Sequence, residues 1–227
     1  MKKILAAGLL VAPFTVAMAQ SSVTLYGIVD AAVRRTNNEG PANNIGMSQT
    51  QMIGGGMSQS RWGINVEEDL GGGSKALAFL ENRFDADAGN SAIGAPFFQL
   101  SYVGLQGPYG RLTAGRQWNV LFDVVTSTYA SFPYSPYMEA YKPEIGMSMG
   151  SRSNNMLKYT AEYGPFRGSL QYSMDEGNTV DALGATAAAA GAFKTAGGYL
   201  RYSANGISAG AGYLNTTLPG GTKVDAW

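Results

Sequence analysis

The chain has 227 residues, with 16 basic and 16 acidic side chains, and it contains neither histidine nor cysteine. Without histidine there is no imidazole metal ligand and no His-activated nucleophile, so most hydrolase mechanisms are excluded. The balanced charge also gives no indication of nucleic-acid binding. We therefore expect neither an enzyme nor a cofactor, no metal site and no nucleic-acid partner.

The first 19 residues have the pattern of a secretory signal peptide. Lys2 and Lys3 give a positive start, residues 4–12 are apolar, and the small residues 17–19 suit a cleavage site. The alternative is a membrane anchor, but the apolar run is interrupted at Pro13 and is too short to span a bilayer. We expect cleavage after Ala19 and a single domain over residues 20–227.

Apolar and polar residues alternate with period two through most of this domain, which predicts β-strands with two different faces. In residues 23–33, for example, Val23, Leu25 and Val29 share one face, while Thr24 and Asp30 share the other. Similar strands are expected at 61–67, 75–84, 99–105, 111–115, 156–163, 166–174, 194–202 and 207–215, with a tenth strand starting at Lys223.

The connections between these segments are alternately short and long. Short turns lie near residues 70, 108, 164 and 205, and long connections lie at 35–58, 86–96, 117–152 and 175–192. This alternation indicates an all-β fold: a transmembrane, antiparallel, up-and-down β-barrel. A soluble β-sandwich also has many short strands, but it rarely combines this loop pattern with aromatic strand ends. The Ala-rich end of 175–192 is read as a loop, with a short helix as the alternative.

Several short motifs then point to a family. Residues 22–30 (SVTLYGIVD) resemble the first strand of β-proteobacterial general porins. Further matches follow in the same order: SRWG at 60–63, EEDLGGG at 67–73, YVGL at 102–105, GRQ at 115–117, RSNN at 152–155 and KY at 158–159. Each motif is weak by itself, but the ordered set covers nearly the whole chain.

The resemblance implies a 16-stranded barrel that forms a homotrimer in outer-membrane lipid of a Gram-negative bacterium. It also implies a pore for ions and small polar solutes, narrowed by a loop that folds inward. Such a barrel needs roughly 300 residues or more. We therefore expect this chain to be the N-terminal portion of a longer protein. An outer-membrane barrel acting mainly as an adhesin is the alternative function.

Charged residues on the polar faces are the candidates for the pore constriction. Successive side chains of a strand point to opposite faces, so Arg61 and Arg152 lie on the face opposite to their lipid-facing neighbours, in the lumen. Strict alternation along the strand would point Arg116 outward, although a bend at Gly115 could turn it inward. The resemblance places all three in the arginine cluster of the barrel wall, and Arg83 is a weaker fourth candidate. Solvated strand-end residues are the alternative reading for each.

Three further charged side chains are expected to line the pore. They are Asp30, Glu81 and Lys158.

Residues 117–152 are the best candidate for the inward constriction loop, because the connection is long, aromatic and stiffened by prolines. Residues 143–146 (PEIG) resemble the acidic tip that porin loops place opposite the arginines. This makes Glu144 the first candidate for the acidic side of the constriction and Glu139 the second. Asp123 is expected to anchor the base of the loop.

Overall fold

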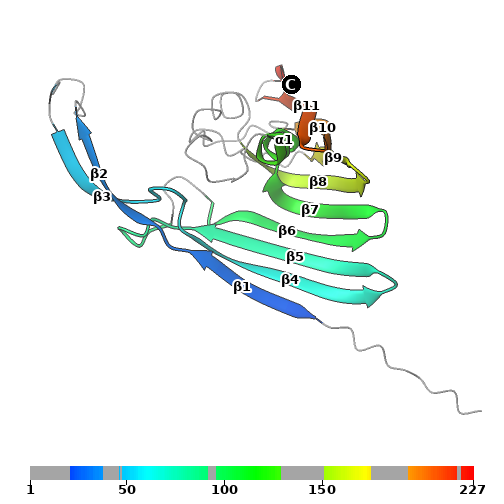
Figure 1. Cartoon of the computed structure of the whole chain (residues 1–227), viewed down its shortest axis with the longest axis horizontal. Helices are drawn as coiled ribbons and strands as arrows, with labels where there is room; N and C mark the ends of the chain where they lie inside the picture. Colours follow the sequence, from blue (N-terminus) through cyan, green and yellow to red (C-terminus); the bar gives the residue numbers. More distant parts are fainter. Residues whose placement is uncertain are drawn as a thin grey trace, which may run out of the picture.

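The computed structural model describes residues 21–37, 46, 48–91, 96–128, 151–174, 194–218 and 221–227. These residues form one ten-stranded antiparallel sheet, one separate two-stranded sheet and one helix (Figure 1). The strands of the large sheet, in spatial order, are β1 (Ser22–Ile28), β4 (Arg61–Gly71), β5 (Ser74–Arg83), β6 (Phe98–Gly107), β7 (Gly110–Trp118), β8 (Arg152–Tyr163), β9 (Phe166–Ser173), β10 (Lys194–Ala204), β11 (Ile207–Thr217) and β12 (Lys223–Ala226).

The two faces of the large sheet differ as the alternation predicts. On the outer face, Leu25, Leu170 and Leu200 are 72%, 67% and 58% exposed. On the inner face, polar side chains such as Thr113 and Gln171 are buried. A sheet that turns its polar groups inward and its apolar groups outward is suited to lipid on the outside and water on the inside. The predicted fold class is confirmed, and β1 and β12 are the two edges of the described sheet.

Short turns connect neighbouring strands at one end of the sheet. The turns at residues 72–73, 108–109, 164–165 and 205–206 join four hairpins, as predicted. Asn205 and Gly206 have φ angles of 53° and 78°. Two successive positive φ angles are typical of the tight hairpin turns that match the twist of antiparallel strands. All the long connections leave the sheet at the opposite end, which below is called the long-loop end.

The prediction of a single strand over residues 23–33 is wrong. Strand β1 ends at Ile28, and β2 (Ala31–Asn37) pairs only with β3 (Ser48–Gly54), in a hairpin that projects beyond the long-loop end (Figure 1). The chain leaves the large sheet at Asp30, whose carbonyl accepts a hydrogen bond from the Gly55 amide at 3.1 Å. Residues 35–58 were predicted to be a long connection, but they contain β3 and the end of β2.

A helix that was not predicted, α1 (Val120–Thr128), lies inside the predicted constriction loop. Asn119 caps it, since its Oδ1 accepts the Phe122 amide at 2.9 Å. The helix packs on the inner face of β9–β11 through the apolar cluster of Val120, Val124, Tyr199 and Leu214. Within the described ranges, no helix is long and apolar enough to cross a membrane.

The contact between α1 and the wall depends on a glycine in β11. A Cβ atom on Gly212 would lie 3.0 Å from Val124 Cγ2 and 3.3 Å from Leu121 Cδ2. We expect Gly212→Leu to displace the helix and to lower the free energy of unfolding by about 1–3 kcal/mol, the usual cost of overpacking. Denaturant unfolding measures this change. Ala211→Leu, whose side chain is on the outer face, is the matched control and should be close to neutral.

Candidate pore constriction site

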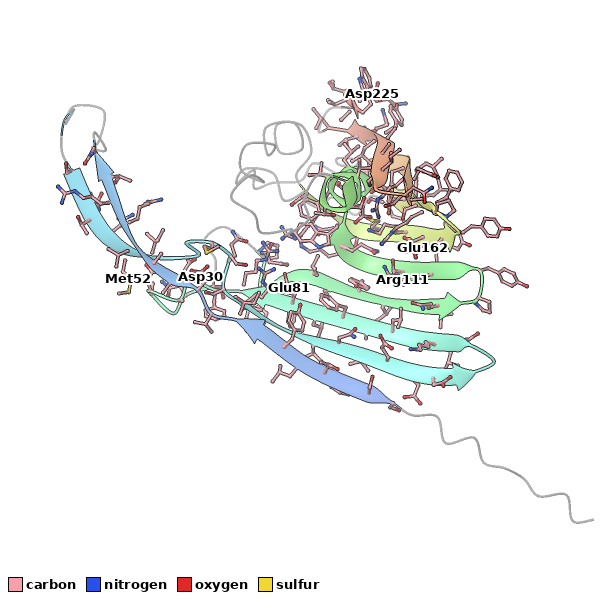
Figure 2. All side chains as sticks on the ribbon, in the orientation of Figure 1. Asp30, Met52, Glu81, Arg111, Glu162 and Asp225 are labelled. Carbon is pink, nitrogen blue, oxygen red and sulfur yellow. The ribbon has the colours of Figure 1, made fainter. Side chains whose placement is uncertain are left out.

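The inner face carries a cluster of charged side chains centred on Glu81, near the long-loop end (Figure 2). Glu81 Oε1 accepts Arg83 Nε at 3.1 Å, and its Oε2 lies 4.0 Å from Arg61 Nη1. Arg61 and Arg83 are register partners on β4 and β5. Arg61 and Glu81 are only 1% and 3% exposed. The two guanidinium groups therefore share one carboxylate, and this half of the cluster is net positive.

A tyrosine from the edge strand completes the environment of Glu81. The Tyr26 hydroxyl donates a hydrogen bond of 2.9 Å to Glu81 Oε2, although β4 lies between their strands. The Tyr26 ring can cross β4 because its register partner is Gly63; a Cβ there would lie 2.6 Å from the ring. Tyr26 was not among the predicted site residues.

The other half of the cluster surrounds the indole of Trp118, at the end of β7. The Arg152 guanidinium carbon lies 3.7 Å from the ring centroid, and that of Arg83 lies 5.4 Å from it. Trp118 also stacks on Phe122 of α1, with the ring centroids 3.8 Å apart. Cation–π contacts of this kind stabilise a guanidinium without neutralising its charge. Trp118 thus links the Arg61–Glu81–Arg83 group to Arg152, and no feature of the sequence had singled it out.

Lys158 connects this cluster to the inward helix. Its Nζ donates hydrogen bonds to Asp123 Oδ2 at 2.7 Å and to the Trp118 carbonyl at 2.8 Å. The Lys158 and Asp123 side chains are 8% and 17% exposed. Asp123, which the sequence analysis assigns to the base of the long connection, therefore ties α1 to the barrel wall.

Arg116 lies where the strict alternation of β7 fails. Gly115 has a φ of 130°, Asn155 has a φ of 49°, and the pairing of β7 with β8 shifts register between Gly115 and Gln117. Arg116 donates to the Gln99 carbonyl at 3.1 Å and to Asn154 Oδ1 at 2.5 Å. Its register position pairs with Ser101, on the outward side, whereas Trp118 two residues later contacts the inner arginines. The bulge brings Arg116 beside the segment that carries Arg152.

Asp30 lies outside the large sheet and holds the loop that supports Arg61. Its carboxylate accepts the amides of Gly56, Met57 and Ser58 at 3.1, 2.9 and 2.7 Å. Ser58 Oγ in turn accepts Arg61 Nη2 at 2.5 Å. Asp30, predicted to line the pore, is thus occupied with this loop in the structure.

The backbone hydrogen bonds from Met57 and Ser58 lower the pKa of Asp30 below its ordinary value of 3.8. A carboxylate whose pKa is lowered by folding contributes stability above its unfolded pKa and loses it as pH falls through the folded value. We expect hydrogen exchange at the Met57 and Ser58 amides to remain slow at neutral pH and to accelerate, relative to the intrinsic rate, only below about pH 4. In Asp30→Asn this acid-dependent loss should be absent; the same acid dependence in both proteins would contradict the assignment.

The described part of the site therefore collects five cations and two carboxylates from four strands and one helix. The cations are Arg61, Arg83, Arg116, Arg152 and Lys158, and the carboxylates are Glu81 and Asp123. Glu139 and Glu144 lie outside the described residues. No group of three or more acidic side chains suited to a metal ion occurs among the residues that the structure covers.

An up-and-down sheet with an apolar outer face, a polar inner face and an inward helix defines the wall of an outer-membrane β-barrel. The comparisons with known proteins agree: the model of the Gram-negative porin family matches residues 5–227. The chain belongs to this family, whose members are channels and not enzymes.

Individual relatives are also outer-membrane porins. The chain is 35% identical to outer membrane porin protein 32 of Delftia acidovorans, over 99% of this chain and 63% of that protein. It is 36% identical to an outer membrane porin protein of Bordetella pertussis, over 76% of this chain and 48% of that protein. The chain thus spans less than two thirds of the length of either relative.

Solved structures show the same fold. An anion-selective porin from Comamonas acidovorans superimposes with a TM-score of 0.69 at 31% identity, over 91% of this chain and 61% of that one. OmpT of Vibrio cholerae, at 15% identity and a TM-score of 0.57 over 90% of this chain and 55% of that one, shares the fold alone.

Proposed function

We propose that this protein forms the wall of a water-filled outer-membrane channel through which ions and small hydrophilic solutes diffuse, with a preference for anions. The observation that carries the proposal is the excess of cations over carboxylates in the cluster around Glu81 and Trp118. Four inward cations, Arg61, Arg83, Arg152 and Lys158, lie there with two carboxylates, and both carboxylates are already in ion pairs.

The electrostatics of such a cluster favour anions. Arginine keeps its charge at any physiological pH, and low-dielectric walls focus the field of fixed charges into the aqueous space between them. Rings of charged side chains at a narrow point are the usual source of ion selectivity in channels. The similarity to a porin described as anion-selective supports the same preference here.

The opposite side of the constriction is assigned to the loop at 117–152. Its first part, α1, packs on the inner face, and this supports an inward course for the connection. Glu144, with Glu139 as the second candidate, then provides the acidic groups opposite the arginines. Opposed charges across a pore create a transverse field that orients water and dipolar solutes.

A reversal-potential measurement tests the proposal. Protein extracted from outer membranes should raise the conductance of planar bilayers, and under a KCl gradient the zero-current potential should have the sign of chloride preference. Absence of conductance would contradict the channel, and preference for potassium would contradict the role given to the cation cluster.

The assembly and location follow from the family resemblance. We propose export with cleavage after Ala19, insertion into outer-membrane lipid, and assembly as a homotrimer. Mass spectrometry of the native complex and of its N-terminal peptide tests both points: the expected results are three copies and an N-terminus at Gln20.

A second candidate, surface adhesion, is favoured by the hairpin of β2 and β3. This hairpin projects beyond the long-loop end and exposes Val33, Met52, Arg34 and Arg35. Deletion of residues 33–52 separates the two functions. Loss of binding to host surfaces with unchanged swelling of protein-loaded liposomes in small sugars would show that the hairpin serves adhesion and the barrel serves diffusion.

A further inference from the structure

A second feature of the inner wall lies between the cation cluster and the short-turn end of the sheet. It is a cavity of about 390 Å³, lined by side chains from β1, β4, β5, β6 and β7. This volume is within the range of small-molecule sites, which is about 300–1,000 Å³. The cavity adjoins the constriction site through Tyr26, which donates to Glu81, but none of the five clustered cations lines it.

Aromatic rings form one side of this cavity. Tyr26, Phe79 and Tyr102 make a continuous stack across the sheet, with centroids 5.9 and 5.3 Å apart and planes 28° and 18° from parallel. At these separations nearly parallel rings are displaced from one another, so part of each ring remains available to a further flat group. Leu77 adds an aliphatic contact in the same cavity.

At the cavity, apolar side chains occupy the inner face, as Tyr199 and Leu214 do beneath α1. Phe79 and Leu77 occupy the inward positions of β5, in register with Tyr102 and Gly104 of β6. Water would be a poor partner for these groups, whereas a solute with an apolar face gains from covering them. The stack therefore points to a ligand with a flat apolar part.

One charged group of the cavity, the Arg111 guanidinium, is available to bind a ligand. Arg111 lines it and makes no hydrogen bond or ion pair with any residue that the structure describes. The one acidic group of the lining, Glu67, is already paired with Lys75 at 2.9 Å. Figure 2 shows Arg111 closer than Glu81 to the short-turn end of the sheet. An unpaired guanidinium beside stacked rings is complementary to a carboxylate attached to a ring.

We propose that this cavity binds small aromatic monocarboxylates, with the ring on Phe79 and Tyr102 and the carboxylate on Arg111. This rests on the proposed channel function, because the solute reaches the cavity through the lumen. The site would hold such anions on the short-turn side of the constriction and favour their passage over that of aliphatic anions of similar size.

Single-channel recording with benzoate tests this inference. Benzoate should reduce the chloride current in a saturable way, while acetate and benzyl alcohol at the same concentration should not, since each lacks one of the two recognition elements. Phe79→Leu and Arg111→Gln should each raise the half-blocking concentration of benzoate by about two- to tenfold, because each weakens binding. Phe79→Trp keeps an aromatic face and should retain the block.

Matched controls lie elsewhere on the same barrel. Tyr172→Leu removes an aromatic ring from the outer face, and Arg201→Gln removes a cation from the inner face of β10, away from the cavity. Both should leave the benzoate block unchanged.

Direct binding to the detergent-solubilised protein, by saturation-transfer NMR, separates the two proposals. A conducting channel that responds to benzoate no more than to acetate would overturn this inference and leave the channel function intact. A protein that does not conduct but binds benzoate in an Arg111-dependent way would overturn the channel and support the site. Equal binding by the wild type and by Phe79→Leu/Arg111→Gln would also overturn the site.

Discussion

Replacing Arg61 and Arg152 together with serine is expected to lower the anion-to-cation permeability ratio by about tenfold. Each guanidinium, at roughly 8 Å from a passing ion in water, changes the energy of an anion and of a cation by about 0.5 kcal/mol in opposite senses. Two arginines would then change the energy difference between an anion and a cation at the constriction by about 2 kcal/mol. Salt screening reduces the resulting change in the permeability ratio to about one order of magnitude. The reversal potential under a KCl gradient measures the ratio directly.

The effect should depend on position and not on the loss of positive charge alone. Arg201→Ser removes a cation of the inner face near the 205–206 turn, where its Nε donates to Ser208 Oγ. This control should change the ratio by much less than the double variant. Arg83 still neutralises Glu81 when Arg61 is absent, so the wall should remain folded. An unchanged reversal potential in the double variant would refute the role assigned to Arg61 and Arg152.

Asp123→Ala is expected to release α1 from the wall. It leaves the Lys158 ammonium, which is 8% exposed at its side chain, without its carboxylate. Removing one partner of a buried pair typically costs about 3–5 kcal/mol; here we expect about 2 kcal/mol, since Lys158 keeps the Trp118 carbonyl. The free energy of unfolding should fall by this amount, and the open-channel current should become noisier as the helix loses its anchor.

A double-mutant cycle tests this explanation. Lys158→Met in the Asp123→Ala background removes the unpaired charge and should recover part of the lost stability. If the double variant is less stable than Asp123→Ala by the full cost of Lys158→Met alone, the two side chains are not coupled, and the ion pair does not anchor the helix.

Much of the architecture is determined locally, and these parts were predicted. The alternation in β9, where Leu170 and Tyr172 face outward and Ser169 and Gln171 are buried, is a property of the extended chain itself. The tight turns likewise depend on local residues such as Asn205 and Gly206, whose backbones accept positive φ angles. The fold class and the positions of the four short-turn hairpins of the large sheet therefore follow from sequence patterns of two to ten residues.

Helix α1 and the projecting hairpin were not predicted, because distant contacts stabilise them. The helix exists on the inner face because Gly212 leaves room for Val124 and because Gln171 accepts the Val120 amide at 2.6 Å. The break between β1 and β2 depends on amides about 26 residues further along the chain, which bind Asp30. No local pattern contains such information.

The candidate site divides in the same way. The alternation of side chains along a strand was enough to predict that Arg61 and Glu81 would face inward, because the face of a side chain depends only on its position in the strand. Alternation put Arg116 on the outward side, where its register partner Ser101 lies, but the bulge near Gly115 that brings it beside the segment of Arg152 depends on the pairing with β8. The pairing of arginines with Trp118, the reach of Tyr26 over Gly63 and the salt bridge of Lys158 with Asp123 were decided by tertiary structure. They join strands separated by tens of residues, and their energies depend on distance and burial, which only the folded chain defines.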